Sequence, residues 1–250
     1  MFIHYRTEGF FLKKMARGES DQLFTIYTKD FGKLEILAKA VRKIKSKLRS
    51  GADLFYFSEL EFIQGKRYKT LTDAVSMERF RQQRKDLRKT AIAHKVSELC
   101  CKLVKDGEQD NGLWQLLKKT FERLNNVLKD KSTYLLIYYY FLWNLVSLLG
   151  YKPELRHCFF CHKKITIGKF YFSASNGGIM CQNCFEENAP KAISIKKDCR
   201  IVEANVIKIL RLILQREWNT LAKVKIGALH QKQLQDISEY FVGSLPSYSK

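Results

Sequence analysis

Short motifs of catalysis are missing from this chain of 250 residues. It contains no G-x-x-x-x-G-K-[ST] or G-x-G-x-x-G phosphate loop, no H-E-x-x-H metal pair and no G-x-S-x-G nucleophile turn. The H-x-E and P-C-x-x-C pairing of zinc deaminases is also absent. Acidic residues are few and scattered, so the sequence offers few carboxylates to hold the metal ions of a two-metal nuclease. Together these absences favour a binding protein over an enzyme.

Negative charge is scarce as well. Lys and Arg number 45 against 25 for Asp and Glu, which gives a formal net charge of +20. Such an excess repels itself unless an anionic partner offsets it, and the usual partners are nucleic acid or an anionic membrane. The alternative is a basic surface that only keeps the protein in solution. Because the cations are clustered, we expect an anionic partner.

A secretory signal and a membrane span are also missing from the sequence. The first six residues, MFIHYR, have no apolar core, so we expect a cytoplasmic protein with no membrane partner. The longest apolar run, Tyr134 to Leu149, is shorter than the about 20 residues of a spanning helix and contains Asn144 and several tyrosines. Gly150 follows as a C-cap. We interpret the run as a central helix that is buried on all sides.

Four of the seven cysteines form two C-x-x-C pairs, nineteen residues apart. This spacing is typical of a zinc site, and in a reducing compartment it favours a metal over disulfides. Four sulfur ligands would complete the tetrahedron of one structural Zn²⁺ and leave no position for a substrate. His157 and His162 each neighbour a cysteine, and either one is an alternative ligand. The predicted ligands are Cys158, Cys161, Cys181 and Cys184.

The first 76 residues are predicted to be all-β. Five short segments are rich in β-branched and aromatic residues and are separated by turn signals. Five strands fit a small closed barrel, of which the OB-fold is the commonest, although an SH3-like barrel fits the periodicity too. The expected strands are 9–16, 22–28, 34–40, 54–64 and 67–75.

Helical periodicity replaces the strand pattern after Asp73. One amphipathic helix is expected around 92–104, a second from Leu113 to Leu128 with Asn111 as its cap, and two more follow Asp198, which we expect to be an N-cap. The cysteine segment interrupts the helices as a zinc ribbon with two knuckles and a hairpin. The sequence thus predicts an α+β chain: an OB-fold barrel in 1–76, helical domain in 77–154 and 191–250, and zinc ribbon in 155–190.

The densest cluster of charge lies between the third and fourth expected strands. Six basic residues occur there with no acidic residue among them, and on a barrel they would converge on one patch that binds phosphates. A solvated linker is the alternative. The six are Lys39, Arg42, Lys43, Lys45, Lys47 and Arg49.

A second basic run spans residues 79–89 and is interrupted by Asp86. It fits a phosphate track and a solvated helix face almost equally. Further basic residues accompany the cysteine segment: Lys152, Arg156, Lys163, Lys164, Lys169, Lys191, Lys196 and Lys197.

Aromatic residues are frequent in the expected strands. Most strand aromatics belong to a core, but OB-folds also stack bases on such rings, and about a quarter of these are expected to do so. The candidates are Phe10, Phe11, Tyr27, Phe55, Tyr56, Phe57 and Tyr68.

The order of several short motifs resembles that of the RecO family of bacterial recombination mediators. The apolar helix, the cysteine pairs and the C-terminal helices match the rest of that family, so the resemblance covers nearly the whole chain. The motifs are TEGFFL from Thr7, GESD from Gly18, DFGKL from Asp30, AKAVR from Ala38 and KTLTDA from Lys69.

The resemblance implies a function. RecO-like proteins bind single- and double-stranded DNA, anneal complementary strands and help load RecA on DNA coated with single-strand DNA-binding protein (SSB). Their partners are RecR and the C-terminal tail of SSB, they are not enzymes, and they act on the bacterial nucleoid. The family's basic positions fall on Lys39, Arg42 and Lys43, and Lys45, Lys47 and Arg49 extend the patch. Val41 departs from the family, where a small or basic residue is usual.

Two other functions fit the charge and the expected fold. An RNA-binding or ribosome-associated zinc-ribbon protein would show the same features, and only the family resemblance favours DNA. A zinc-ribbon DNA glycosylase is the enzyme alternative. Annealing of DNA strands, binding of structured RNA and incision of a damaged duplex distinguish the three functions.

Overall fold

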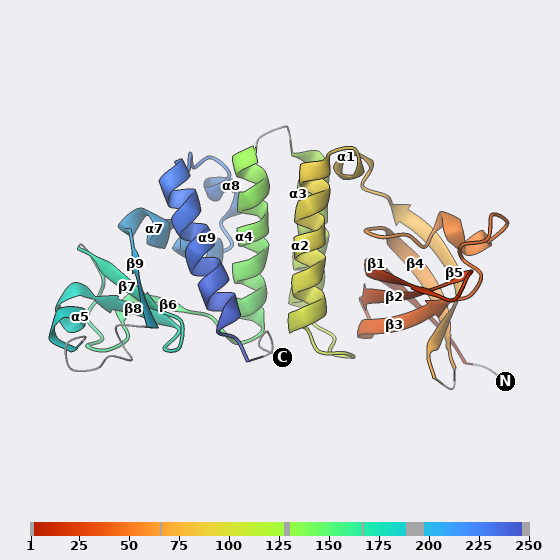
Figure 1. Cartoon of the computed structure of the whole chain (residues 1–250), viewed down its shortest axis with the longest axis horizontal. Coiled ribbons are helices and arrows are strands. Elements are labelled where there is room, and N and C mark those ends of the chain that lie inside the picture. The colour runs from red at the N-terminus through yellow and green to blue at the C-terminus, as the bar shows by residue number, and fades with distance from the viewer. Residues whose placement is uncertain (1–2, 66, 128–130, 167, 189–197, 247–250) are drawn as a thin grey trace. The chain divides into compact units, whose positions relative to one another are not determined.

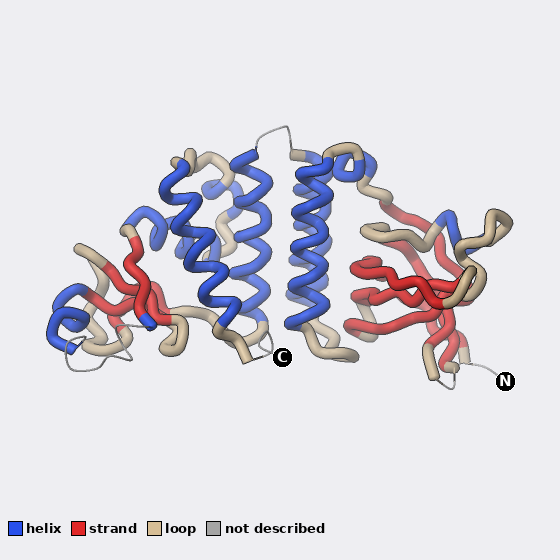
Figure 2. Tube along the Cα trace, in the orientation of Figure 1, coloured by secondary structure: helices blue, strands red, loops and turns tan. Residues whose placement is uncertain are grey.

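The computed structural model describes residues 3–65, 67–127, 131–166, 168–188 and 198–246. The chain divides into two compact units, residues 1–130 and residues 131–250. Each unit combines a group of strands with helices (Figures 1 and 2). Within the described ranges, no helix is long and apolar enough to cross a membrane.

The first unit begins with a closed five-stranded barrel, as predicted. Neighbouring strands follow the order β1-β2-β3-β5-β4, and antiparallel pairing of β4 with β1 closes the barrel. Among the described residues of the barrel, β3 and β5 form the one parallel pair. Five strands closed in this way form an OB-type barrel. The strands are β1 (His4–Arg17), β2 (Asp21–Thr28), β3 (Gly32–Ala38), β4 (Phe57–Gln64) and β5 (Lys69–Glu78).

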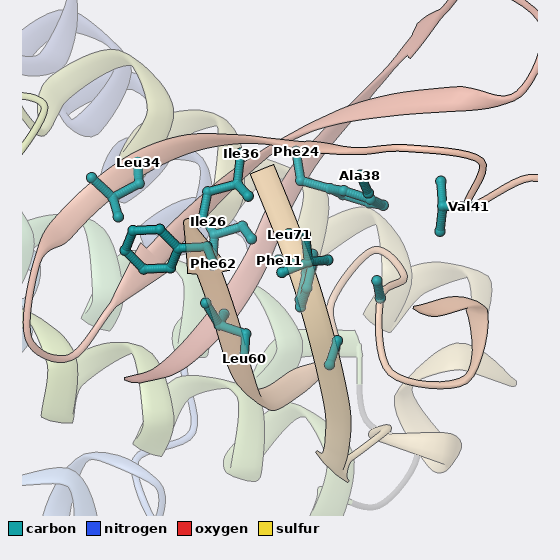
Figure 3. Close-up of a cluster of buried hydrophobic side chains, with 12 residues drawn as sticks. Phe11, Phe24, Ile26, Leu34, Ile36, Ala38, Val41, Leu60, Phe62 and Leu71 are labelled. Carbon is teal, nitrogen blue, oxygen red and sulfur yellow. The ribbon is translucent and has the colours of Figure 1, made fainter. Parts of the chain in front are cut away.

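The barrel is filled by apolar side chains from all five strands (Figure 3). Phe11, Phe24 and Phe62 supply the largest of them, and each is at most 1% exposed. Alternate residues of a strand point to opposite faces, which is why the apolar residues of β2 and β3 enter the core at every second position. Val41 lies beyond the end of β3 and still belongs to this core. The segment after β3 is therefore held against the barrel.

Three helices complete the first unit: α1 (Arg81–Arg84), α2 (Leu87–Leu103) and α3 (Asn111–Asn126). An aromatic cluster joins them to the barrel, because the ring of Phe10 lies 4.8 Å from Phe57, 5.2 Å from Trp114 and 5.5 Å from Phe121. The helical region starts later than predicted, since β5 continues past Asp73 to Glu78. The predicted cap of α3 was also wrong by one residue: Asp110 is the N-cap and accepts the N–H of Leu113.

The second unit contains the helix expected from the apolar run, α4 (Lys131–Leu148), together with α7 (Ala204–Leu214), α8 (Trp218–Leu221) and α9 (Ala228–Gly243). Most of α4 from Tyr134 to Val146 is buried. Its polar groups are paired: Trp143 donates to Ser238 over 2.9 Å and Asn144 donates to the carbonyl of Ile213 over 3.0 Å. Gly150 has φ +90, as a glycine after a helix end commonly does.

A four-stranded sheet with the order β6-β8-β7-β9 forms the rest of the second unit. It consists of β6 (Glu154–Cys158), β7 (Phe170–Ser173), β8 (Gly178–Cys181) and β9 (Cys199–Val202), and α5 (Gln182–Asn188) follows β8. The antiparallel β7–β8 pair is the hairpin expected between the cysteine pairs. The sheet gains two further strands, β6 and β9, that the sequence did not predict.

Asp198 corrects another prediction. The N-cap of α7 is Glu203, so Asp198 does not cap that helix. Its carboxylate instead accepts hydrogen bonds from Ser175 over 2.6 Å, from Ser173 and from Tyr240. These bonds tie the start of β9 to β7 and to α9. Lys191, Lys196, Lys197 and Leu128 lie outside the residues that the structure describes.

Candidate nucleic-acid interface and metal centre

The six predicted DNA-binding cations lie on one segment, residues 39–51, which follows β3 and leads to β4. This segment is called the basic loop below. All six side chains are exposed: Lys39, Arg42, Lys43, Lys45, Lys47 and Arg49. Lys47 and Arg49 belong to a short 3-10 helix, η1 (Lys47–Ser50). The segment contains no acidic residue, so its positive charge is not neutralised from within.

The start of the basic loop is fixed to the barrel. Ala40 adopts φ +52, and its N–H donates to the carboxylate of Asp21 over 2.7 Å. The N–H of Arg42 donates to the carbonyl of Ser20 over 3.0 Å. Between them, Val41 is 3% exposed and packs in the barrel core. The buried position of Val41 explains why an apolar residue occurs at this point of the basic loop. Its side chain anchors the loop in the core, and the backbone N–H groups of Ala40 and Arg42 bond to the start of β2 and to the β1–β2 turn.

The end of the basic loop is fixed as well. A Cβ at Gly51 would lie 1.9 Å from the carbonyl oxygen of Ala74 in β5, so only glycine allows the loop to approach so closely. The hydroxyl of Ser58 in β4 donates to the carbonyl of Gly51 over 2.7 Å. The loop between Ala40 and Gly51 is thus an ordered platform whose cations point outward.

Part of the second basic run lies beside the basic loop. Arg79 donates to the carbonyl of Ser50 over 3.0 Å, and Arg84 donates to the carbonyl of Leu54 over 2.6 Å. Both guanidinium groups lie over the ring of Tyr56, at 5.5 and 4.8 Å from its centroid. Lys89 is different, because it is 5% exposed and donates to the carbonyl of Val127. Arg79 and Arg84 therefore extend the basic surface, whereas Lys89 does not.

A pocket of about 430 Å³ opens between the basic loop and the barrel. Lys14 of β1, Arg42, Arg49 and Tyr56 line it. The single acidic group of its lining, Asp53, forms ion pairs with Lys14 at 2.8 Å and with Arg84 at 2.7 Å. Burial alone would raise the pKa of Asp53, but hydrogen bonds from Lys14, the Leu54 N–H and Arg84 hold that pKa below its ordinary value. Asp53 is thus ionised near neutral pH and holds the two cations in place.

Lys14 was missed by sequence reasoning. It follows Lys13 in β1, outside both basic runs, and only closure of the barrel brings it beside Asp53 and the basic loop. The only signal in the sequence is a lysine within a strand, and this signal is weak because such a lysine normally faces solvent.

The strand aromatics divide into two groups. Phe10, Phe11, Tyr27, Phe55 and Phe57 are at most 6% exposed and belong to the core or to the aromatic cluster. Tyr56 and Tyr68 are partly exposed, and each has arginine over its ring. Of the seven candidates, only these two offer a ring to a nucleic-acid base.

The four predicted metal ligands meet at one point. Cys158 ends β6 and Cys161 follows in the next turn, while Cys181 ends β8 and Cys184 lies in α5. Their sulfur atoms all lie within 4.8 Å of one another, and those of Cys161 and Cys181 are 3.9 Å apart. Sulfurs bound at about 2.3 Å to a tetrahedral zinc would be about 3.8 Å apart. The cluster fits a metal ion, and all seven cysteines are free thiols rather than disulfides.

Protein groups already prepare this cluster for an ion. Burial opposes ionisation of Cys158, but backbone N–H groups of Cys161, Cys181 and Phe160 lower its pKa to about 7. Burial and the neighbouring thiols raise the pKa of Cys184 instead. A divalent cation would remove that penalty, because a coordinated thiol is deprotonated. The rings of His157 and His162 are not members of the cluster.

Fold and site together define the class of protein: an OB-type barrel with an exposed basic loop, joined to a helical region that carries a four-cysteine cluster. Two family models match it in sequence. "Recombination protein O N terminal" matches residues 1–80, and "Recombination protein O C terminal" matches residues 84–244. The chain therefore belongs to the RecO family.

Relatives named "DNA repair protein RecO" agree with this assignment. The protein of Dehalococcoides mccartyi strain CBDB1 is 32% identical over 223 residues, which cover 89% of this chain and 83% of that protein. The protein of Caldanaerobacter subterraneus subsp. tengcongensis is 28% identical over 236 residues, which cover 94% and 90%. That of Desulfitobacterium hafniense strain DCB-2 is 28% identical over 237 residues, which cover 95% and 83%.

Proposed function

We propose that this chain is a DNA repair and recombination mediator that binds DNA through the basic loop. The observation that carries the proposal is the set of six exposed cations on a loop that the barrel fixes at both ends. When these cations neutralise DNA phosphates, they displace the counterions condensed on the DNA, and the release of those counterions drives binding. Membership in the RecO family supports DNA as the nucleic acid.

The mechanism is electrostatic and involves no bond chemistry. A fixed cationic surface lowers the repulsion between two phosphate backbones, so complementary strands can meet and pair on it. Lys14, Arg79 and Arg84 extend the surface around the pocket beside Tyr56, where an unpaired base can stack. The chain would thus bind single- and double-stranded DNA and anneal complementary strands without acting as an enzyme.

Partners follow from the family resemblance. We propose that the chain acts with RecR and with the C-terminal tail of SSB to load the recombinase on SSB-coated DNA, in the cytoplasm and on the nucleoid. We further propose one structural Zn²⁺, held by Cys158, Cys161, Cys181 and Cys184, in a segment that is too small to fold without it. The boundaries 1–76, 77–154, 155–190 and 191–250 remain our proposal for the domains.

An annealing assay tests this function. The protein should speed pairing of complementary DNA oligonucleotides, both free and coated with SSB, and an SSB-tail peptide should capture it. Structured RNA bound more tightly than DNA, with no annealing, would favour the RNA-binding alternative. Incision of a damaged duplex that persists without metal would show an enzyme and contradict the proposal.

A further inference from the structure

A second cationic surface lies in the second unit, where the structure shows two adjoining open pockets of about 400 and 450 Å³. Residues of β6, of α7 and of the segments beside β6 line them. Arg156 of β6 and Arg211 of α7 line both pockets, so the two pockets adjoin at these side chains. Lys152 lines the first pocket and Lys164 the second. The groove defined by these four cations is called the β6–α7 groove.

Arg211 is held rigidly at the centre of this groove. Its Nε and Nη2 donate to the carbonyl of Leu155 over 2.9 and 2.5 Å. Burial and the positive charge of Arg156 lower the pKa of Arg211, and the negative charge of Glu154 opposes this shift. A planar guanidinium fixed in this way is suited to bind the oxygens of an anion in a defined direction.

The β6–α7 groove carries an excess of positive charge, because the described residues that line it supply four Lys and Arg side chains and one carboxylate, that of Glu154. Lys152, Arg156 and Lys164 are exposed, and no carboxylate of the described chain lies within 4.0 Å of any of the four cations. Glu154, the one acid of the lining, accepts the backbone N–H groups of Arg156 and His157 over 2.5 and 3.0 Å, and its charge acts on Arg156 and Arg211. Glu154 is therefore engaged with its own strand. Four cations against one carboxylate around the groove favour an anionic ligand.

The form of the groove indicates which anion binds. Its apolar lining residues include Leu155 and Ile165, which are 3% and 6% exposed, and the partly exposed Leu214. Tyr151, next to Lys152, is 38% exposed and can stack on a base. Spread cations with an adjacent aromatic ring are typical of surfaces that follow a phosphodiester backbone.

We propose that the β6–α7 groove is a second nucleic-acid binding site, which holds the phosphodiester backbone independently of the basic loop. The inference rests on the proposed function, because it assumes that DNA is the ligand of the chain. It assigns a binding role to the surface beside the cysteine cluster and supplies one chain with two places for phosphates. Two phosphate-binding surfaces on one chain allow it to hold two strands at once during annealing.

The test uses the full-length protein and four forms of it: wild type, Lys39→Ala/Arg42→Ala/Lys43→Ala, Lys152→Ala/Arg156→Ala/Lys164→Ala, and both triples combined. Affinity for a fluorescent single-stranded oligonucleotide is measured over a range of salt concentrations. The groove triple should reduce the salt slope by about two units and the affinity by about tenfold or more, in either background. It should also slow annealing while short-strand binding to the basic loop persists.

A matched control removes the same charge from another part of the second unit. Lys223, Lys225 and Lys232 are exposed, and replacing all three with alanine should leave the slope near that of wild type. Arg156 lies two residues before Cys158, so its replacement could disturb the cysteine cluster; Lys152→Ala/Lys164→Ala, which keeps Arg156, therefore serves as a second variant. Metal content and thermal unfolding verify that each variant folds.

The failures of the two proposals are distinguishable. If the groove triple has the same slope as the control triple while wild type binds DNA normally, the groove is not a binding site. The same conclusion follows if the groove triple binds a polyglutamate peptide more weakly than wild type does but binds DNA equally well. If wild type itself shows no salt-dependent DNA binding, the proposed function is contradicted instead.

Discussion

Single residues fix the surface on which the proposed function depends. Gly51 allows the basic loop to lie against Ala74, Val41 anchors the same loop in the core, and Asp53 holds Lys14 and Arg84 together. None of these three residues is itself a cation of the basic loop. Each contributes by keeping cations in fixed positions, which lowers the entropy that they lose when phosphate binds.

Replacement of Gly51 tests this at the scale of one residue. Gly51→Ala puts a Cβ 1.9 Å from the carbonyl oxygen of Ala74, and because backbone cannot move aside easily, the loop must shift. We expect a loss of about 1–3 kcal/mol in the free energy of unfolding, as for other overpacked sites. DNA affinity should fall too, although no charge is removed.

The matched control is Gly243→Ala. Gly243 is the last residue of α9, and a Cβ there meets nothing within 4 Å. Alanine is the better helix former, so stability should stay constant or rise by up to about 1 kcal/mol. Chemical unfolding and fluorescence anisotropy measure both effects. Equal stability and equal DNA binding of Gly51→Ala and wild type would show that the close approach does not matter.

At the scale of elements, β6 and β8 bring the cysteines together. Each strand delivers one cysteine at its end, and the turn after β6 and the helix α5 deliver the other two. The hairpin β7–β8 has only four residues in each strand, so a bound metal is expected to supply much of the folding free energy of this region.

Removal of one ligand tests the metal centre. Cys161→Ser should lower the metal content from one Zn²⁺ per chain to a small fraction and increase amide hydrogen exchange in residues 155–188, because three thiolates bind zinc far more weakly than four. Binding of DNA to the basic loop should persist in part. Cys199→Ser, a change in the same sheet but outside the cluster, should retain the metal. Wild-type protein free of zinc by metal analysis would disprove the assignment.

Much of this architecture was predictable from local patterns, and the misses have physical causes. The barrel, the buried helix α4 and the cysteine cluster follow from alternation, apolar length and spacing, which are local features. Asp198 looked like an N-cap because the type of residue fits one, yet its partners Ser173 and Tyr240 are distant in sequence. The strand β9 and the pairing of Lys14 with Asp53 also depend on contacts between distant segments, which no local pattern encodes.

For the whole molecule, the net charge of +20 is the property that most directly supports the proposed binding of DNA. Each of the two units contributes one cationic surface: the basic loop with Arg79 and Arg84 in the first, and the β6–α7 groove in the second. Such a distribution predicts steep salt dependence and rapid association with DNA at low salt. It also predicts that replacing cations weakens binding to all sequences to a similar degree, because phosphates carry no sequence.

The salt dependence of DNA affinity tests the central claim most directly. Replacing Lys39, Arg42 and Lys43 with alanine should weaken binding of a single-stranded oligonucleotide and reduce the slope of log affinity against log salt by up to about three units. Lys223→Ala/Lys225→Ala/Lys232→Ala, which removes equal charge, should keep the slope of wild type. A slope that the basic-loop triple leaves unchanged would contradict the account and remove that loop from the DNA-binding site.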